Sequence, residues 1–375
     1  MATITVSPNG RNFYDYRGPA TELLVGTADG IVAFNRAALD APWQETHREL
    51  RGKHIESLVV EPTSGMIFAG VNRGGIWASE DGGQSWERRD DGIASDKIYA
   101  LNYVQAGEEL RLYAGTEPAE LYVSTDFGHH WRHLPALRNV PSVNDWTFPG
   151  GDRIAHVKTI AFHPSDPNTV YVGVEVGGAF KSTDGGETFR ELNEGGFHVD
   201  VHRLMVAPSR PDDLYMSTGR GIYHSTDGGE GWEKLPLPGV GTDGRAANQG
   251  IYYPDGLVIL PGQPDVMFTS GANSAPPFWG QNGGASARVG RTRDGGRTWE
   301  YLAEGLAGGR ANIEAMTMEV HPGGFELYAG TTDGDVLTSE DDGEHWTTIA
   351  AGLAPVSKGG HYRGVRPEWE PVAAG

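Results

Sequence analysis

One eight-residue pattern recurs along the chain and constrains its fold more than any other feature. The pattern is Ser/Thr-x-Asp-x-Gly-x-x-Trp/Phe, and each copy is called a box turn below. Its six copies are residues 79–86, 124–131, 182–189, 225–232, 292–299 and 339–346. They recur about every 45 residues, which is the length of a four-stranded propeller blade.

Short strand patterns precede the box turns, as in 112–116 and 327–331, where aromatic or branched residues alternate with small ones. Residues 20–50 carry similar strand patterns without an intact box turn, which makes a seventh unit. We therefore predict an all-β fold, a seven-bladed β-propeller that forms one domain over residues 1–375. The predicted blades are residues 20–50 with 358–366, then 54–89, 97–134, 156–192, 200–235, 253–302 and 312–350.

The first unit lacks an innermost strand of its own. Residues 358–365 resemble residues 51–58 in their pattern of basic, glycine and histidine positions. We predict that the C-terminal segment 358–366 is the innermost strand of the first blade and closes the ring, because closure removes exposed sheet edges.

Composition narrows the classes of function. The net charge of −20 disfavours a nucleic-acid partner, since no basic stripe is available to neutralise phosphates. The absence of cysteine excludes disulfides and thiolate metal sites. No apolar run reaches 18 residues and the first residues lack a signal-peptide pattern, so we expect a cytoplasmic protein without a membrane partner.

The box turns resemble the repeats of the Asp-box, or BNR, family, and the resemblance covers nearly the whole chain. That family includes sialidases, xyloglucan-cleaving glycoside hydrolases, sortilin-type receptors and photosystem assembly factors. The resemblance implies a propeller with its box turns on the rim opposite a sialidase active site. A classical sialidase is not expected, because the chain has no Arg-Ile-Pro segment and few early arginines. The related xyloglucan enzymes pair two propellers, whereas these repeats make one.

The box turns themselves have a structural explanation. Their Asp and Ser/Thr side chains can bond backbone amides of a tight turn, and the aromatic residue can fill the space between blades. We therefore do not assign catalysis to these aspartates.

Polar residues flank the first apolar residue of each predicted inner strand. They are His54, Glu56, Lys97, Tyr99, His156, Lys158, Asp200, His202, Tyr253, Asp255, Glu314, His361 and Arg363. Because inner strands all begin at one rim, we expect these side chains to surround one mouth of the central channel. Crowded ionisable groups shift one another's pKa values, which favours acid and base roles.

Roles within this predicted ring follow from side-chain chemistry. The candidate catalytic residues are Glu314, Asp200, Glu56, Tyr253, Lys158 and His202. The candidate metal ligands are His54, His156, His361 and His202, which would suit Zn, Fe, Mn or Ca; no organic cofactor is indicated. The alternative is a wet channel whose polar groups only satisfy one another through water.

Three insertions extend toward the same rim, at 138–155, 239–254 and 271–290. Their aromatic residues could wall a binding cleft, or could instead anchor the loops to the propeller. The candidate substrate-binding residues are Arg363, Lys97, Tyr99, Trp146, Tyr252, Trp279 and Asn282.

These features favour an enzyme, a hydrolase or lyase that acts on a small polar or carbohydrate-like ligand at the channel mouth, with or without a divalent metal. Carbohydrate as a substrate is implied by the family resemblance. The alternative is a non-catalytic propeller that binds a peptide or protein, like the assembly-factor and receptor branches of the family.

Overall fold

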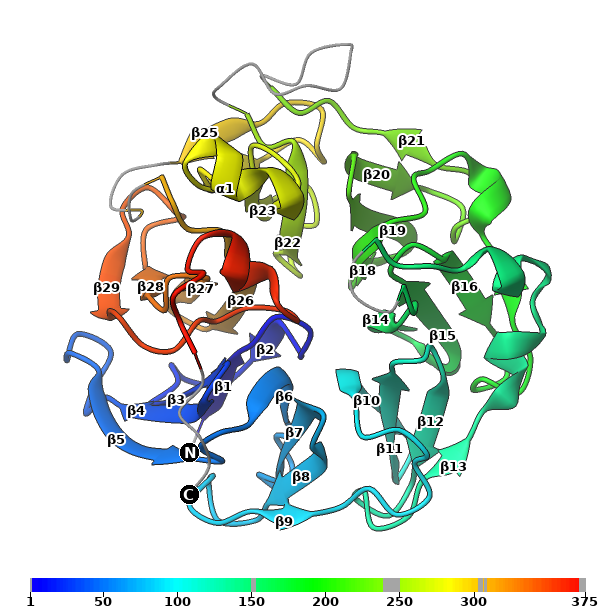
Figure 1. Ribbon diagram of the computed structural model, residues 1–375, viewed down its shortest axis with the longest axis horizontal. Coiled ribbons are helices and arrows are strands. Elements are labelled where there is room, and N and C mark those ends of the chain that lie inside the picture. The colour runs from blue at the N-terminus through cyan, green and yellow to red at the C-terminus, as the bar shows by residue number, and fades with distance from the viewer. Residues whose placement is uncertain (1, 150–152, 239–249, 303–305, 307–308, 371–375) are drawn as a thin grey trace.

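Seven small sheets surround a central axis in the computed structural model, which describes residues 2–149, 153–238, 250–302, 306 and 309–370 (Figure 1). The seven-bladed β-propeller is therefore confirmed. Most of the predicted insertion 239–254 and residues 150–152 of the first insertion lie outside the described residues. No helix of the described residues is long and apolar enough to cross a membrane.

The first three blades consist of four strands each, named in order from the channel outward. They are β1 (Thr3–Val6), β3 (Glu22–Thr27), β4 (Gly30–Asn35) and β5 (Gln44–Glu49); β6 (His54–Val60), β7 (Ile67–Asn72), β8 (Gly75–Ser79) and β9 (Glu87–Arg88); and β10 (Ile98–Ala106), β11 (Glu109–Thr116), β12 (Leu121–Ser124) and β13 (Arg132–His133).

The other four blades continue around the ring in chain order. They are β14 (Val157–His163), β15 (Asp166–Val174), β16 (Gly178–Ser182) and β17 (Arg190–Glu191); β18 (Val201–Ala207), β19 (Arg210–Thr218), β20 (Gly221–Ser225) and β21 (Glu233–Lys234); β22 (Tyr253–Ile259), β23 (Met267–Ala272), β24 (Arg288–Thr292) and β25 (Glu300–Leu302); and β26 (Ile313–His321), β27 (Gly324–Thr331), β28 (Val336–Ser339) and β29 (Thr347–Ala350), with β2 (Phe13–Asp15) added beside β26.

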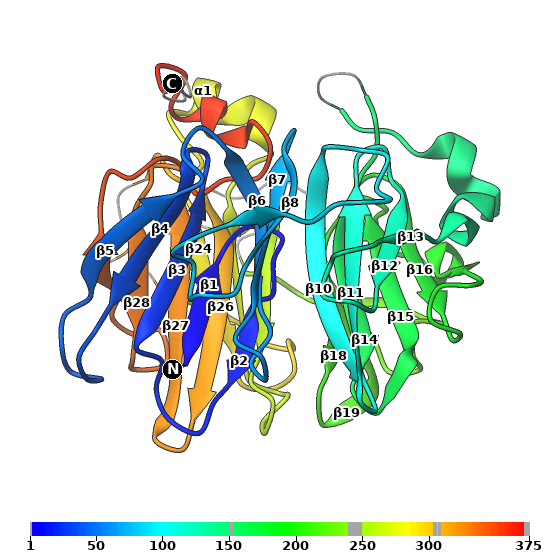
Figure 2. The same ribbon diagram turned by 90° about the horizontal axis from the view of Figure 1, so that it is seen from below.

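Short helical turns decorate the connections. They are η1 (Pro135–Asn139), η2 (Pro141–Asp145), η3 (Asn193–Gly195), η4 (Pro276–Phe278), α1 (Trp279–Asn282) and η5 (His361–Gly364). Figure 2 shows α1 and the C-terminal segment together on one face of the ring, and η4 contacts η5.

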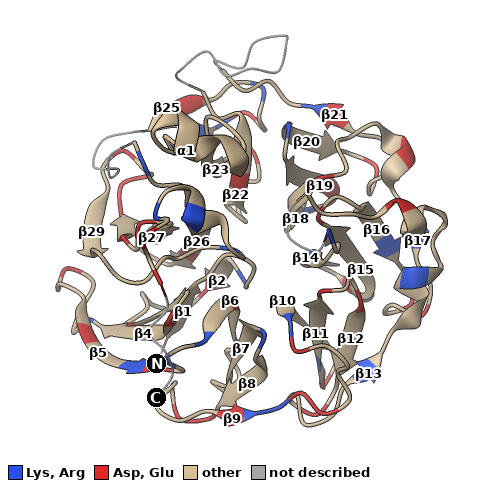
Figure 3. Ribbon diagram, in the orientation of Figure 1, with Lys and Arg blue, Asp and Glu red and all other residues tan. Residues whose placement is uncertain are grey.

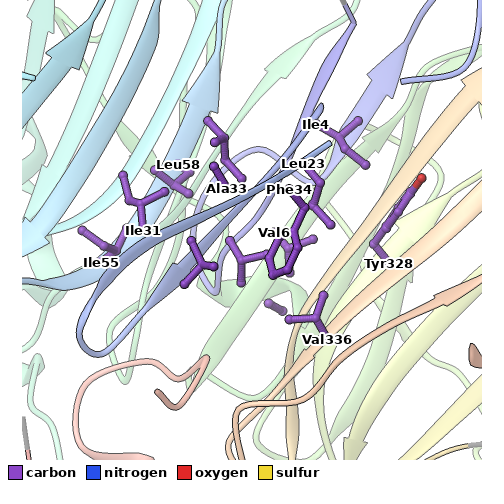
Figure 4. Packing of buried hydrophobic residues seen from close by; sticks show 14 of the residues in the cluster. Ile4, Val6, Leu23, Ile31, Ala33, Phe34, Ile55, Leu58, Tyr328 and Val336 are labelled. Carbon is purple, nitrogen blue, oxygen red and sulfur yellow. The ribbon is translucent and has the colours of Figure 1, made fainter. Parts of the chain in front are cut away.

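The prediction that residues 358–366 form the innermost strand of blade 1 is wrong. Strand β1 pairs in parallel with β3 at that position, with Ile4 opposite Leu23 and Val6 opposite Val25. Ile4 and Val6 are buried in the core of this blade (Figure 4), whereas Val365 of the C-terminal segment packs in the cluster with Trp279 instead. The C-terminal chain reaches only the start of the innermost position, where Ala28 donates its amide to Pro355, and then turns into η5.

The N-terminal segment instead closes the ring. After β1, residues 7–12 cross the channel, and β2 then pairs in parallel with β26 of blade 7. Arg203 of blade 5 and Leu257 of blade 6 hydrogen-bond this crossing segment, through the carbonyl of Gly10 and the side chain of Asn12. One segment thus joins the first and last blades and fills the channel between them.

Adjacent blades pack closely because a glycine lies near the C-terminal end of most second strands. A Cβ atom at Gly115 would lie 2.4 Å from Cγ1 of Val157, the first residue of the next inner strand. A Cβ at Gly173 would lie 2.7 Å from Val201 in the same way. The glycine of these strands is therefore a packing requirement between blades.

Candidate functional site

A repeated irregularity of the inner strands creates the candidate site. The pairing of the inner with the second strand shifts after the first residue in β10, β14, β18 and β26, and after the second residue in β6 and β22. Such bulges re-aim side chains. The side chains within the six shifts include Glu56, Tyr99, Lys158, His202, Asp255 and Glu314, and all six are buried.

Glu314 and Glu56 hold the two chain ends at this mouth. Glu314 accepts hydrogen bonds from the Ser357 hydroxyl (2.9 Å) and the Lys358 amide (2.8 Å). Glu56 accepts the Gly359 amide (2.9 Å) and the Asn9 side chain (3.2 Å). The predicted catalytic carboxylates Glu314 and Glu56 are thus engaged in fastening the chain.

Lys358 extends from the C-terminal segment into the mouth. Its buried ammonium pairs with Asp255, whose other oxygen accepts a 2.6 Å hydrogen bond from Asn312. Burial opposes the charge of Lys358, but Asp255, Glu175 and Glu314 together hold its pKa above the usual value. The C-terminal segment therefore covers part of the mouth with a charged, paired side chain.

Glu175, which follows β15, is the centre of a second buried cluster. Its Oε2 accepts a hydrogen bond from His156 Nε2 (2.7 Å) and forms an ion pair with Lys158 Nζ (3.0 Å). Burial opposes its ionisation, but Lys158, Lys358 and His156 hold the pKa of Glu175 well below its usual range. Burial also lowers the pKa of Lys158 despite the neighbouring carboxylate.

His202 faces this cluster from the next blade. Its Nδ1 lies 2.7 Å from the carbonyl oxygen of Pro254, and its Nε2 lies 3.5 Å from Asp200 Oδ1 and 4.0 Å from Glu175 Oε1. His202 Nε2 and Glu175 Oε1 are buried and have no hydrogen-bond partner. Burial opposes ionisation of Asp200, and the His202 imidazole more than offsets it, so the pKa of Asp200 is lowered.

Glu175, Asp200 and His202 form the one group among the described residues whose ligand atoms are close enough to hold a metal ion. The predicted set of metal-binding histidines does not come together. His54 contacts the carbonyl oxygen of Ser357, His156 contacts Glu175, and His361 contacts Glu314. Only His202 of that set belongs to the group, because each of the others is turned toward its own acceptor.

Other predicted residues of the ring surround these clusters. Tyr99 stacks on His156 with ring centroids 3.9 Å apart, and Lys97 pairs with Glu117. Tyr253 packs beside His202 with centroids 4.5 Å apart, and burial raises the pKa of Tyr253 well above its usual value. Arg363 is exposed and lies over the Tyr362 ring rather than in the mouth.

The aromatic residues predicted to bind substrate, Trp146, Tyr252 and Trp279, are packed against the protein. Trp279 is fully buried, and its Nε1 donates to the Ser274 carbonyl (2.7 Å). Tyr252 packs against the cluster that contains Trp279, and Asn282 is exposed and bonds Ser274. Trp146 packs on Phe180, with its Nε1 on Ser142. These placements match the alternative in which the aromatic residues anchor their loops.

Sequence reasoning missed Glu175 and Lys358. Glu175 lies two residues after the strand glycine Gly173, and the same offset in other blades gives Asn72 and Glu117, which also face the mouth residues Glu56 and Lys97. That offset is a usable signal. Lys358 lies in a segment whose pattern indicates a strand, so its insertion into the mouth was not predictable from strand alternation.

The box turns form the hydrogen bonds expected of tight turns. In the first, the Ser79 hydroxyl accepts the Gly83 amide (2.8 Å) and donates to Asp81 (2.8 Å). Bonds from the Ser85 hydroxyl and amide lower the pKa of Asp81 to about 2. A hollow of about 490 Å³ lies between the second and third box turns, on charged surface that includes Asp126 and Asp184. Its aspartates are occupied in their own turns.

Charged residues of both signs are interspersed around the described part of the ring, as Figure 3 shows.

Comparisons with known proteins identify similar folds. No family model matches the chain. The xyloglucanase Xgh74A of Acetivibrio thermocellus is 24% identical over 286 residues, which are 67% of this chain and 32% of that enzyme, and a second Xgh74A sequence of the species is 26% identical over the same shares. The chain thus spans about a third of the length of these curated relatives.

Two solved structures share the propeller architecture. An ancestral GH74 enzyme has a TM-score of 0.60 at 18% identity and covers 79% of this chain and 38% of its own. YCF48 bound to D1 peptide has a TM-score of 0.58 at 15% identity and covers 88% of this chain and 93% of its own. At these identities the likeness shows the fold alone.

Proposed function

We propose that this protein is a hydrolase or lyase that acts on a small polar, carbohydrate-like substrate at the channel mouth. The observation that carries the proposal is the meeting of His202 Nε2, Glu175 Oε1 and Asp200 at the junction of blades 4 and 5, with two buried polar atoms left unpartnered. Buried polar atoms without partners are costly in a fold unless a ligand or reaction uses them.

In this proposal the substrate reaches the site at Asp200. Its side chain is 17% exposed, whereas the side chains of His202 and Glu175 are each 1% exposed. A substrate that reaches Asp200 would meet a proton acceptor and, behind it, the Lys158 ammonium, which can stabilise a developing negative charge. The similarity to xyloglucanases supports a glycan as the substrate class. The box turns support placement among Asp-box repeat proteins.

The proposal is tested by incubating the protein with a panel of xyloglucan oligosaccharides and uronate-containing glycosides. New reducing ends would indicate hydrolysis, and the ultraviolet absorbance of a conjugated double bond would indicate elimination. We expect turnover that Asp200→Asn lowers by at least about 100-fold, in line with the loss of a general base. Turnover that Asp200→Asn leaves intact, or none with any substrate, would refute a catalytic site here.

A second candidate function is peptide binding. It is favoured by the likeness to YCF48 bound to D1 peptide, which covers nearly all of that chain with a single propeller. A fluorescent peptide library titrated with the protein would test it. Saturable binding by a protein that turns over no glycan would favour this function over the first.

A further inference from the structure

We infer that Glu175 Oε1, Asp200 and His202 Nε2 bind one divalent transition-metal cation, of the zinc or manganese class. The inference deepens the proposed function, on which its catalytic meaning rests. The three ligand atoms come from the end of β15, the connection before β18 and the second residue of β18, and they lie within 4.8 Å of one another.

The tautomer of His202 is fixed from outside the site. A carbonyl oxygen can only accept a hydrogen bond, so the contact of Nδ1 with the Pro254 carbonyl at 2.7 Å places the proton on Nδ1. In its neutral form the ring then carries its lone pair on Nε2, which points at Asp200 and Glu175. A ligating histidine usually donates its other ring N–H to a carbonyl or carboxylate in this way.

Glu175 is fixed by the same logic. His156 and Lys158 both contact its Oε2, which holds the carboxylate and leaves Oε1 turned toward His202 without a partner. Buried neighbours therefore set the orientation of this ligand oxygen, as the hydrogen-bond partners of ligating carboxylates do in metal sites.

The spacing of the ligand atoms suits a cation at their centre. Two ligands about 2.1 Å from a tetrahedral zinc ion lie about 3.4 Å apart. His202 Nε2 lies 3.5 Å from Asp200 Oδ1 and 4.0 Å from Glu175 Oε1. A small closure of Glu175 toward His202 would complete the geometry, and Asp200 leaves the outer side open for water or substrate.

Charge favours a cation over a neutral occupant. The buried or half-buried carboxylates of the mouth outnumber its cationic side chains: Glu56, Glu117, Glu175, Asp200, Asp255 and Glu314 against Lys97, Lys158, Lys358 and Arg203. An imidazole nitrogen with two carboxylates is typical of zinc, manganese or iron sites, whereas calcium and magnesium prefer oxygen ligands alone.

The rival arrangement has no metal. In it His202 is doubly protonated and its Nε2–H points at Asp200. Both arrangements satisfy Nδ1, so the measurement must detect the cation itself.

The test is calorimetric titration of chelator-treated, tag-free protein with zinc, manganese and calcium chlorides. We expect one zinc or manganese site per chain and no calcium site. Asp200→Asn, which keeps shape and hydrogen bonding, and His202→Ala should each weaken that site by at least about ten-fold. Circular dichroism confirms that each variant is folded, and the Asp200→Asn variant serves if His202→Ala does not fold.

His224→Ala is the matched control. His224 is a half-buried histidine of the same blade 5, and like His202 it has an unpartnered Nε2 near a carboxylate, Asp213 at 3.6 Å, but no second carboxylate of the described residues completes a group there. The His224→Ala variant should therefore bind zinc or manganese as tightly as the wild type. The inference is overturned if the wild type and Asp200→Asn bind equally, which would place any zinc on surface histidines, or if neither binds.

The same data separate this inference from the proposed enzyme. Stoichiometric metal lost in Asp200→Asn without any turnover keeps the site and removes the enzyme. Turnover by metal-free protein, undiminished by chelator, keeps the enzyme and removes the metal.

Discussion

Arg203 reaches across the channel to Pro8, whose carbonyl oxygen accepts a 2.6 Å hydrogen bond from the guanidinium. A second guanidinium nitrogen donates to the Gly10 carbonyl at 3.1 Å. Arg203 is buried, and burial lowers its pKa to about 10 despite the neighbouring Asp255. A side chain of blade 5 thus holds the segment that joins blades 1 and 7.

Replacing Arg203 should destabilise the whole ring. We expect Arg203→Met to lower the free energy of unfolding by about 2–4 kcal/mol, because two buried carbonyl groups lose charged donors. Urea unfolding followed by tryptophan fluorescence measures the change. Arg210→Met, on an exposed hairpin of the same blade with surface partners Asp213 and Asp265, should cost less than about 1 kcal/mol. Equal effects of both variants would contradict a special role for Arg203.

Removing the Lys358 cation should strongly destabilise the folded protein. Lys358→Met leaves Asp255 buried without its cation, so we expect a loss of about 3–5 kcal/mol in the free energy of unfolding, measured by urea denaturation. Adding Asp255→Asn should recover part of that loss, because it removes the uncompensated charge. A double variant no more stable than Lys358→Met alone would show that the two residues are not coupled.

Glu319 should make stability depend on pH near neutrality. It lies buried in β26, where burial and the nearby Glu326 raise its pKa to about 7 despite Arg36 and the Tyr328 hydroxyl. The folded state therefore holds a proton that the unfolded state releases near its ordinary pKa of 4.5, so stability is greatest below that pH and falls as pH rises toward 7.

Glu319→Gln should remove that dependence. Its stability should exceed that of the wild type by about 1–3 kcal/mol at about pH 8 and match it near pH 4.5. Thermal unfolding across this range measures the difference. A wild type whose stability does not fall between about pH 4.5 and 7 relative to the variant would show that Glu319 titrates normally.

Trp279 should act on stability and not on ligand affinity. Because its side chain is fully buried beside Tyr253 and Val365, we expect Trp279→Ala to lower the free energy of unfolding by about 3–5 kcal/mol. Phe278, its neighbour, is 53% exposed, so Phe278→Ala should change stability by less than about 0.5 kcal/mol. If Trp279→Ala were as stable as the wild type in urea and bound ligand less tightly, Trp279 would be a binding wall after all.

The repeated pattern was sufficient to predict the propeller, because each box turn and each strand glycine meets a local structural need of a blade. Asp81 needs its turn amides, and Gly115 needs to make room for Val157. The alignment of polar residues on the inner strands was also predictable, since Glu56, Lys158 and His202 occupy the corresponding position of β6, β14 and β18.

Closure and pairing within the mouth were not predictable in the same way. Residues 3–6 are too few to show a clear strand pattern, so the sequence favours residues 358–366 as the innermost strand of blade 1. Only the burial of Ile4 and Val6 in the folded protein identifies 3–6 as that strand. Likewise, the partners of Glu175 are set by distances between residues of different blades, and the periodicity of a strand carries no information about those distances.

The crossing of residues 7–12 through the channel has a consequence for biosynthesis. Strand β2 pairs with β26, which lies about three hundred residues further along the chain, so β2 cannot find its partner until the intervening blades have been synthesised. The ring can then latch only after the ribosome has released β26, and the waiting strands β1 and β2 are exposed to chaperones and to mispairing until that moment.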